Sequence, residues 1–263
     1  MDWDIHHGNG IQNLTYDDPY IFYLSIHRAC FDDQKLWFYP GTGKPSEVGE
    51  GSGVGTNLNL VWGQGGMGNE EYATAFSELV LPTLSAFQPD LILVACGLDA
   101  AKGDLLGDCG LSPDMYYIMT KSLLDQAGAD IPIVMVLEGG YNINVVCKCM
   151  EKVALALLDE PCHDGQYYGL SRYLKPTDSC ICSGSKRQRK SRAVKKREAT
   201  AVSSIKQSAS AISRVEGSYW YSSGLAKTMA PDVSIEPYHG NFGPLKKRKG
   251  HCLLQESSPS CVF

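Results

Sequence analysis

Three uninterrupted apolar runs mark the first 160 residues of the chain. They cover residues 21–27 (IFYLSIH), 91–97 (LILVACG) and 131–140 (IPIVMVLEGG), and a shorter run lies at 57–62. Continuous rather than alternating hydrophobicity is typical of strands that are buried on both faces. The pattern therefore predicts four strands in a sheet that is covered on both sides.

Between these runs, apolar residues recur at the spacing of amphipathic helices. Residues 69–87 begin with acidic residues and contain Pro82, which predicts a kink or a break in this helix. Ser112, followed by proline, opens a second helix, and Asn142 caps a third that ends before residue 160. Strands that alternate with helices predict an α/β fold in three layers, with a mostly parallel sheet and helices on both faces.

The pattern stops after Pro161, and the charge reverses there. Residues 1–160 contain 7 Lys and Arg against 22 Asp and Glu, whereas residues 161–263 contain 17 against 7. A segment rich in Ser, Ala, Lys and Arg without sustained apolar periodicity cannot bury enough surface to offset the entropy of ordering. We therefore expect one domain at 1–160 and a largely disordered basic tail at 161–263, with no stable secondary structure across 176–218.

The tail contains two basic clusters, KRQRKSRAVKKR at 186–197 and KKRK at 246–249. Such clusters are typical of nuclear localisation signals or nucleic-acid contacts, although a solvated linker explains them equally well. No apolar run approaches the ~20 residues that a membrane span needs. The N-terminal MDWDIHHGNG lacks the pattern of a signal peptide, so we expect the ten cysteines to be thiols in a reducing compartment.

Chemically useful side chains cluster at the expected carboxyl ends of the strands, where parallel sheets bind ligands. Asp4 and His6 are two residues apart, so in an extended segment they point the same way, which suits a divalent metal. Asp99 follows the second long strand, and Tyr141 follows the Gly139-Gly140 pair, which lets the backbone approach a ligand closely. Each residue alone has an ordinary structural explanation, but together they indicate a metal site.

Four motifs carry a resemblance to a known family. DWDIHHGNG, FYPGTGKPSEVG, CGLDAAKGD and LEGGYN stand in the order, and at roughly the intervals, of the zinc-dependent histone deacetylases, and are most similar to the class II branch. The match covers residues 1 to about 160, roughly the second half of that family's catalytic domain. The resemblance therefore implies an arginase/deacetylase-type fold and an N-terminally truncated catalytic domain.

The resemblance assigns a role to each matching position. It implies that Asp4, His6 and Asp99 bind zinc, and that Tyr141 donates a hydrogen bond to the oxyanion formed from the substrate carbonyl. It also implies that Asp2 and Ser25 lie beside a structural potassium ion and that Asn9 supports the catalytic histidines. The acyl-lysine tunnel would be lined by Tyr39, Leu106 and Gly140. His7 and His27 are expected to be structural.

One part of the family pattern is missing from the sequence. The family's general base is a histidine pair upstream of the DWD motif, whereas the six histidines here stand at 6, 7, 27, 163, 239 and 251. Without that base we expect little activity and an open, apolar sheet edge. The alternatives are an inactive binding module that uses the pocket or the tail, and a two-manganese ureohydrolase, for which further ligands beside Asp99 are absent.

The implied reaction is zinc-dependent hydrolysis of N-acetyl-lysine on proteins, with histones as the first expected substrate. This implies chromatin regulation and transcription repression, with corepressor or chromatin proteins as partners. We expect a nuclear protein that also occurs in the cytoplasm, with nucleic-acid contact through the basic tail and no membrane association.

Overall fold

The structure is a computed structural model that describes residues 1–31, 37–162, 169–174 and 192–213. Its elements are, in order, α1 (Asn9–Thr15), β1 (Tyr23–Arg28), η1 (Gly51–Gly53), β2 (Asn57–Trp62), α2 (Asn69–Ala75), η2 (Phe76–Val80), α3 (Leu81–Phe87), β3 (Ile92–Cys96), α4 (Pro113–Ala127), β4 (Ile133–Leu137), α5 (Ile143–Leu157), η3 (Leu170–Arg172) and α6 (Arg192–Ser213). All four apolar runs form the strands that the sequence predicts.

The strands form parallel pairs, β1 with β2 and β3 with β4. The first residues of the chain join the two pairs, because Asp2 makes parallel bridges to Ser25 of β1 and to Ala95 of β3. The backbone N–H of Asp2 donates to the Leu24 carbonyl at 2.7 Å, and that of Ala95 donates to the Met1 carbonyl at 2.9 Å. The N-terminal segment therefore occupies the centre of the sheet.

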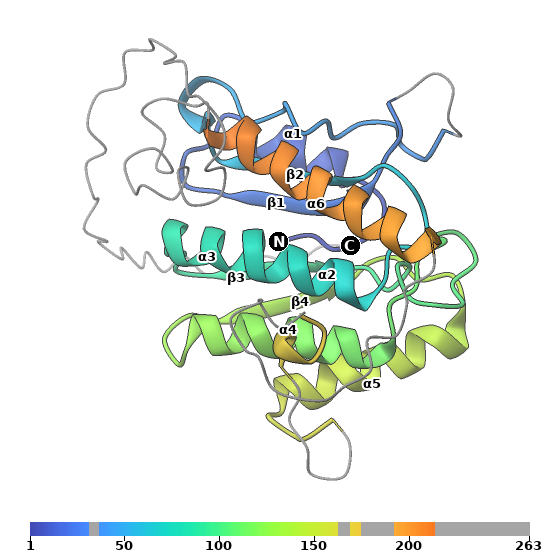
Figure 1. The fold of residues 1–263 in the computed structure, drawn as a ribbon. Coiled ribbons are helices and arrows are strands. Elements are labelled where there is room, and N and C mark those ends of the chain that lie inside the picture. The colour runs from blue at the N-terminus through green and yellow to red at the C-terminus, as the bar shows by residue number, and fades with distance from the viewer. Residues whose placement is uncertain (32–36, 163–168, 175–191, 214–263) are drawn as a thin grey trace, which may run out of the picture.

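Helices cover one face of this sheet along its whole width. Figure 1 shows α6 in front of β1 and β2, α2 and α3 in front of β3, and α4 in front of β4, with α1 behind β1 and β2. The fully buried Trp3 fastens the central segment to this helical layer, since its ring centroid lies 6.3 Å from Phe76 and 6.5 Å from Tyr116. Aromatic pairs of this kind each add about 0.5–1.5 kcal/mol beyond the burial of their surface.

The long helical segment at 69–87 is broken as Pro82 predicts. A π-helical turn, η2, precedes Pro82, which stands at the start of α3. Proline lacks an N–H and its ring clashes with the preceding turn, so a widened turn is a common way for a helix to accommodate it. The predicted cap of α5 is also confirmed, because Asn142 Oδ1 accepts from the Asn144 N–H at 3.2 Å.

The prediction that residues 176–218 lack stable secondary structure is wrong for residues 192–213, which form α6. One face of this helix is buried against the sheet by small side chains, among them Ala201 and Ala209 at 2% exposure each. Ser208 Oγ donates to the Asn59 carbonyl of β2 at 2.7 Å. Half of the basic cluster at 186–197 and all of that at 246–249 lie outside the described residues.

The other face of β3 and β4 is open. Leu93, Val134 and Val136 are 56%, 45% and 48% exposed. Leu93 stands between buried residues of β3, whereas the two valines alternate with half-buried residues of β4. Among the described residues, β4 has β3 as its one neighbour, so its outer edge is unpaired. This agrees with the expected open, apolar edge. No helix in the described part of the chain is both long and apolar enough to cross a membrane.

Candidate metal centre

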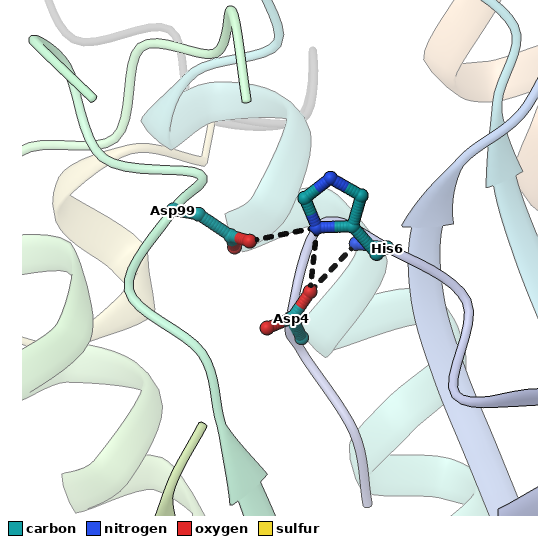
Figure 2. Close-up of side chains that lie close together, drawn as sticks. All are labelled: Asp4, His6 and Asp99. Atoms are coloured by element: carbon teal, nitrogen blue, oxygen red, sulfur yellow. Dashed lines mark hydrogen bonds and ion pairs between the residues drawn. The ribbon is translucent and has the colours of Figure 1, made fainter. Parts of the chain in front are cut away.

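The sheet brings three of the predicted site residues together at the carboxyl ends of its central strands. Asp4 and His6 follow the N-terminal segment, and Asp99 follows β3 (Figure 2). One ligand atom from each residue lies within 4.8 Å of those of the other two. His6 Nδ1 is 3.1 Å from Asp4 Oδ1 and 2.9 Å from Asp99 Oδ2.

Backbone N–H groups orient both carboxylates. Asp99 Oδ1 accepts from the Ile5 N–H at 2.9 Å, and Asp4 Oδ2 accepts from the Gly139 N–H at 3.1 Å. The other oxygen of each carboxylate therefore faces His6. Gly139 belongs to this arrangement for steric reasons, since a Cβ there would lie 2.8 Å from Asp99 Oδ2. Two fixed carboxylate oxygens and an imidazole nitrogen at one point form a preorganised donor set for a divalent cation.

The electrostatics of the cluster reflect its negative charge. Burial would lower the pKa of His6, but its hydrogen bonds to Asp4 and Asp99 outweigh burial and raise the pKa to about 9. Burial raises the pKa of Asp99 to about 6, although its hydrogen bond with His6 opposes that rise. Burial opposes ionisation of Asp4 as well, yet its hydrogen bonds with His6 hold the pKa of that carboxyl below its ordinary value. A positive charge at this point is thus strongly favoured.

Aromatic side chains surround the imidazole of His6. The ring of Tyr141 stands perpendicular to it with centroids 6.0 Å apart, and the ring of Tyr39 lies 6.1 Å away. Phe38, which the sequence analysis did not single out, stacks on His6 at 5.1 Å with an angle of 10° between the rings. Its place directly before Tyr39 in the FYPG motif was the available signal.

The other predicted tunnel residues lie on turns at the same edge of the sheet. Leu106 is 52% exposed on the turn after Asp99, and Gly140 adopts φ +139°, a conformation that L side chains rarely adopt. Asn9 is the exposed first residue of α1 and borders a cavity with His7 and Gln12. Their roles in binding substrate or supporting histidines stay predictions.

Asp2 and Ser25, the predicted potassium residues, are neighbours across the sheet. Asp2 Oδ2 accepts from the Tyr23 hydroxyl at 2.8 Å, and Asp2 Oδ1 accepts from the Asp4 N–H at 3.1 Å. Ser25 Oγ lies 2.8 Å from Nδ1 of His27. Burial raises the pKa of Asp2 to about 7.

His7 and His27 are buried, as expected of structural histidines, and both hold the loop that follows the FYPG motif. His7 Nε2 donates to Gln12 Oε1 at 2.9 Å, which leaves Nδ1 to accept from the Thr42 hydroxyl at 2.8 Å. His27 Nε2 donates to the Gly43 carbonyl at 3.0 Å. These contacts fix the chain just beyond Phe38 and Tyr39, and sequence reasoning did not find them because they join distant segments.

Comparison with known proteins places this geometry in a family. A model of the histone deacetylase domain matches residues 1–157. The chain belongs to the histone deacetylase family. This confirms the resemblance that the four motifs carry.

Several relatives share the matched segment. Histone deacetylase HDA1 of Candida albicans is 44% identical over 163 residues, which make up 61% of this chain and 19% of that protein. Histone deacetylase 15 of Arabidopsis thaliana is 41% identical over 160 residues, covering 61% and 28%. Histone deacetylase 7 of Homo sapiens is 43% identical over 163 residues, covering 60% and 16%. The chain therefore spans less than a third of the length of each of these relatives.

Solved structures agree with the fold class. The histone deacetylase Clr3 is similar with a TM-score of 0.62 and 36% identity, covering 81% of this chain and 30% of that one. The HDA15 HD domain is similar with a TM-score of 0.56 and 41% identity, covering 60% of this chain and 43% of that one. The predicted α/β fold of the arginase/deacetylase type is confirmed.

Proposed function

We propose that this chain carries the metal centre of a zinc-dependent hydrolase that removes acetyl groups from lysine side chains of proteins. The convergence of Asp4, His6 and Asp99 on one point is the observation that carries the proposal. Two carboxylates and one imidazole suit zinc, and three protein ligands leave a fourth position for water and substrate. Among the described residues this is the one cluster of its kind, so the two-manganese alternative lacks its second set of ligands.

The residues around the centre have complementary tasks. Zinc, when bound, polarises the acetyl carbonyl and makes a water more acidic. The Tyr141 hydroxyl donates to the oxygen of that carbonyl as negative charge develops there, a contribution typically of ~10²–10³ in rate. Tyr39 and Leu106, both exposed at the rim, line the path of the lysine side chain, and Gly140 lets the backbone approach it. In a version of the chain that also carries the family's histidine pair, Asn9 supports those histidines.

Asp2 and Ser25 support a structural potassium ion in this proposal. His27 Nε2 donates to a carbonyl, so its Nδ1 accepts from the Ser25 hydroxyl. The oxygen of Ser25 then retains lone pairs for a cation beside the buried carboxylate of Asp2. Oxygen donors are the ligands that alkali cations prefer.

Low activity of the 263 residues by themselves is part of the proposal. The family's histidine pair has no counterpart among the six histidines, and general acid–base catalysis typically contributes ~10²–10⁴ in rate. Histones are the first candidate substrate, because the relatives are named histone deacetylases. Nuclear and cytoplasmic location, corepressor or chromatin partners, and nucleic-acid contact through the basic tail complete the proposal.

The second candidate is an inactive binding module, because the 263 residues by themselves contain no histidine pair outside the metal motif. Hydrolysis of an acetylated histone peptide separates the two. The 263-residue chain is compared with a version extended at its N-terminus by the upstream half of a deacetylase domain, each with and without zinc. The enzyme proposal predicts zinc-dependent acetate release by the extended version and little by the shorter one. An extended version that folds and binds zinc but releases no acetate favours the binding module.

A further inference from the structure

Two turns meet beside the metal centre, and one carboxylate joins them. The first, at Gly103–Gly107, follows Asp99, and the second, at Gly139–Asn142, follows β4. Asp104 lies half-buried in the first turn. Its Oδ2 accepts from the Tyr141 N–H at 2.7 Å.

The other oxygen of Asp104 closes its own turn. Oδ1 accepts from the Leu106 N–H at 2.8 Å and from the Gly107 N–H at 3.1 Å. Asn142 strengthens the junction, since its Nδ2 donates to the Gly103 carbonyl at 2.9 Å. Both oxygens of Asp104 thus serve backbone donors, which fits a carboxylate that holds structure rather than one that moves protons.

We propose that Asp104 is a positioning residue that sets the direction of the Tyr141 hydroxyl and of the Leu106 side chain relative to the metal centre. This inference rests on the proposed function, in which Tyr141 contacts the substrate carbonyl. Two observations show why Tyr141 needs such a support. Its side chain is 45% exposed, and the preceding Gly140, at φ +139°, is the residue type least restricted in its backbone rotation. The hydrogen bond that Asp104 accepts from the Tyr141 N–H holds the backbone from which the phenol extends.

Substitution of Asp104 by asparagine tests the geometry in the 263-residue chain. An asparagine side chain has a single acceptor oxygen, so it can serve Tyr141 or the Leu106–Gly107 pair but not both. NMR measures the rate of amide hydrogen exchange in each variant. In Asp104→Asn the rate should rise about tenfold either at Tyr141 or at Leu106 and Gly107, and in Asp104→Ala it should rise at all three, as expected for lost hydrogen bonds to a charged group. Asp108→Asn is the matched control, because Asp108 lies in the same loop but is a 74% exposed partner of Arg28.

The amides of β3 serve as an internal reference in these variants. Faster exchange confined to the two turns supports the positioning role. Unchanged exchange at Tyr141, Leu106 and Gly107 overturns it. Faster exchange that includes β3 also overturns it, because Asp104 then supports the whole fold and not the two turns.

A double-variant cycle shows whether Asp104 acts through Tyr141. The probe is acetohydroxamate, a small zinc chelator whose carbonyl can accept from the Tyr141 hydroxyl, titrated into the zinc-loaded chain by calorimetry. If Asp104 acts through Tyr141, the variant carrying both Asp104→Asn and Tyr141→Phe binds no weaker than Tyr141→Phe alone. If the losses of the two single variants multiply, Asp104 acts independently and the proposal falls. A chain that binds no zinc refutes the proposed function, while amide exchange still decides the positioning of Tyr141.

Discussion

Replacing Ile205 with alanine should release helix α6 from the sheet while the rest of the fold persists. Ile205 is 8% exposed and lies on the same face of α6 as the buried Ser208, which is bonded to β2. A second hydrogen bond holds the helix at Arg197, whose Nη1 donates to the Gly66 carbonyl at 2.6 Å. Among the side chains of the helix whose burial the structure describes, Ile205 is the largest apolar one that is buried, so its loss removes a large part of that apolar contact.

The size of the effect follows from the atoms removed. Isoleucine has three more carbons than alanine, and each buried CH₂ contributes about 0.8 kcal/mol. A helix at the surface can settle into part of the gap, so we expect the low end of the usual range for such substitutions, about 2–3 kcal/mol. Val202 supplies the control, because it lies on the same helix at 47% exposure. Val202→Ala should change stability by less than about 0.5 kcal/mol.

Hydrogen exchange measured by mass spectrometry reports directly how firmly α6 is held on the sheet. At about 1.4 kcal/mol for each tenfold change, exchange in α6 should accelerate by roughly 30- to 140-fold in Ile205→Ala, with β3 unaffected. Equal effects of Ile205→Ala and Val202→Ala would show that the burial of Ile205 does not hold α6 on the sheet. Exchange of α6 at the rate of an unprotected peptide in the unsubstituted chain would also contradict the docking of this helix.

Three further predictions concern the site, the buried histidine and the basic helix. Tyr141→Phe in the extended, active version should lower turnover by ~10²–10³ with zinc retained, and undiminished turnover contradicts its role. Burial lowers the pKa of His27 to about 3 from an ordinary 6.5. As the pH falls, His27 therefore takes up a proton in the unfolded chain before it does so in the folded chain. The stability that the neutral, buried His27 contributes should be fully present above about pH 6.5 and should be lost as the pH falls toward 3. The free energy of unfolding, measured by urea titration, should therefore fall less steeply with decreasing pH in His27→Gln. Joint replacement of the exposed Lys195 and Lys196 by glutamine should reduce nuclear accumulation of a fluorescent fusion without changing its circular dichroism; equal accumulation argues for a plain linker.

The strands and the metal site were predictable because the signals for them are local. Apolar runs mark the strands, although β4 is only half buried. The rule that parallel sheets bind ligands at their carboxyl ends places Asp4 and Asp99 together. The partners of the N-terminal segment were not predictable in this way. Its place between β1 and β3 depends on long-range pairing, which periodicity does not encode.

Helix α6 was missed for a different reason. Its buried face consists mainly of alanine and serine, and these residues give little apolar contrast in a segment rich in lysine and arginine. The contact is completed by a polar bond, from Ser208 to a carbonyl of β2. The contact of Phe38 with His6 and that of Asp104 with Tyr141 were not predictable, because the partners are far apart in sequence.

The zinc content of the purified chain decides whether Asp4, His6 and Asp99 form a zinc centre. The 263-residue chain, Tyr141→Phe and Asp99→Asn are loaded with zinc, dialysed and analysed for metal. We expect about one zinc ion per chain in the unchanged protein and in Tyr141→Phe. Asp99→Asn should lose its zinc, because an amide is a poorer ligand than a carboxylate. Equal retention by all three proteins, or no zinc in the unchanged chain, would contradict a zinc centre at Asp4, His6 and Asp99.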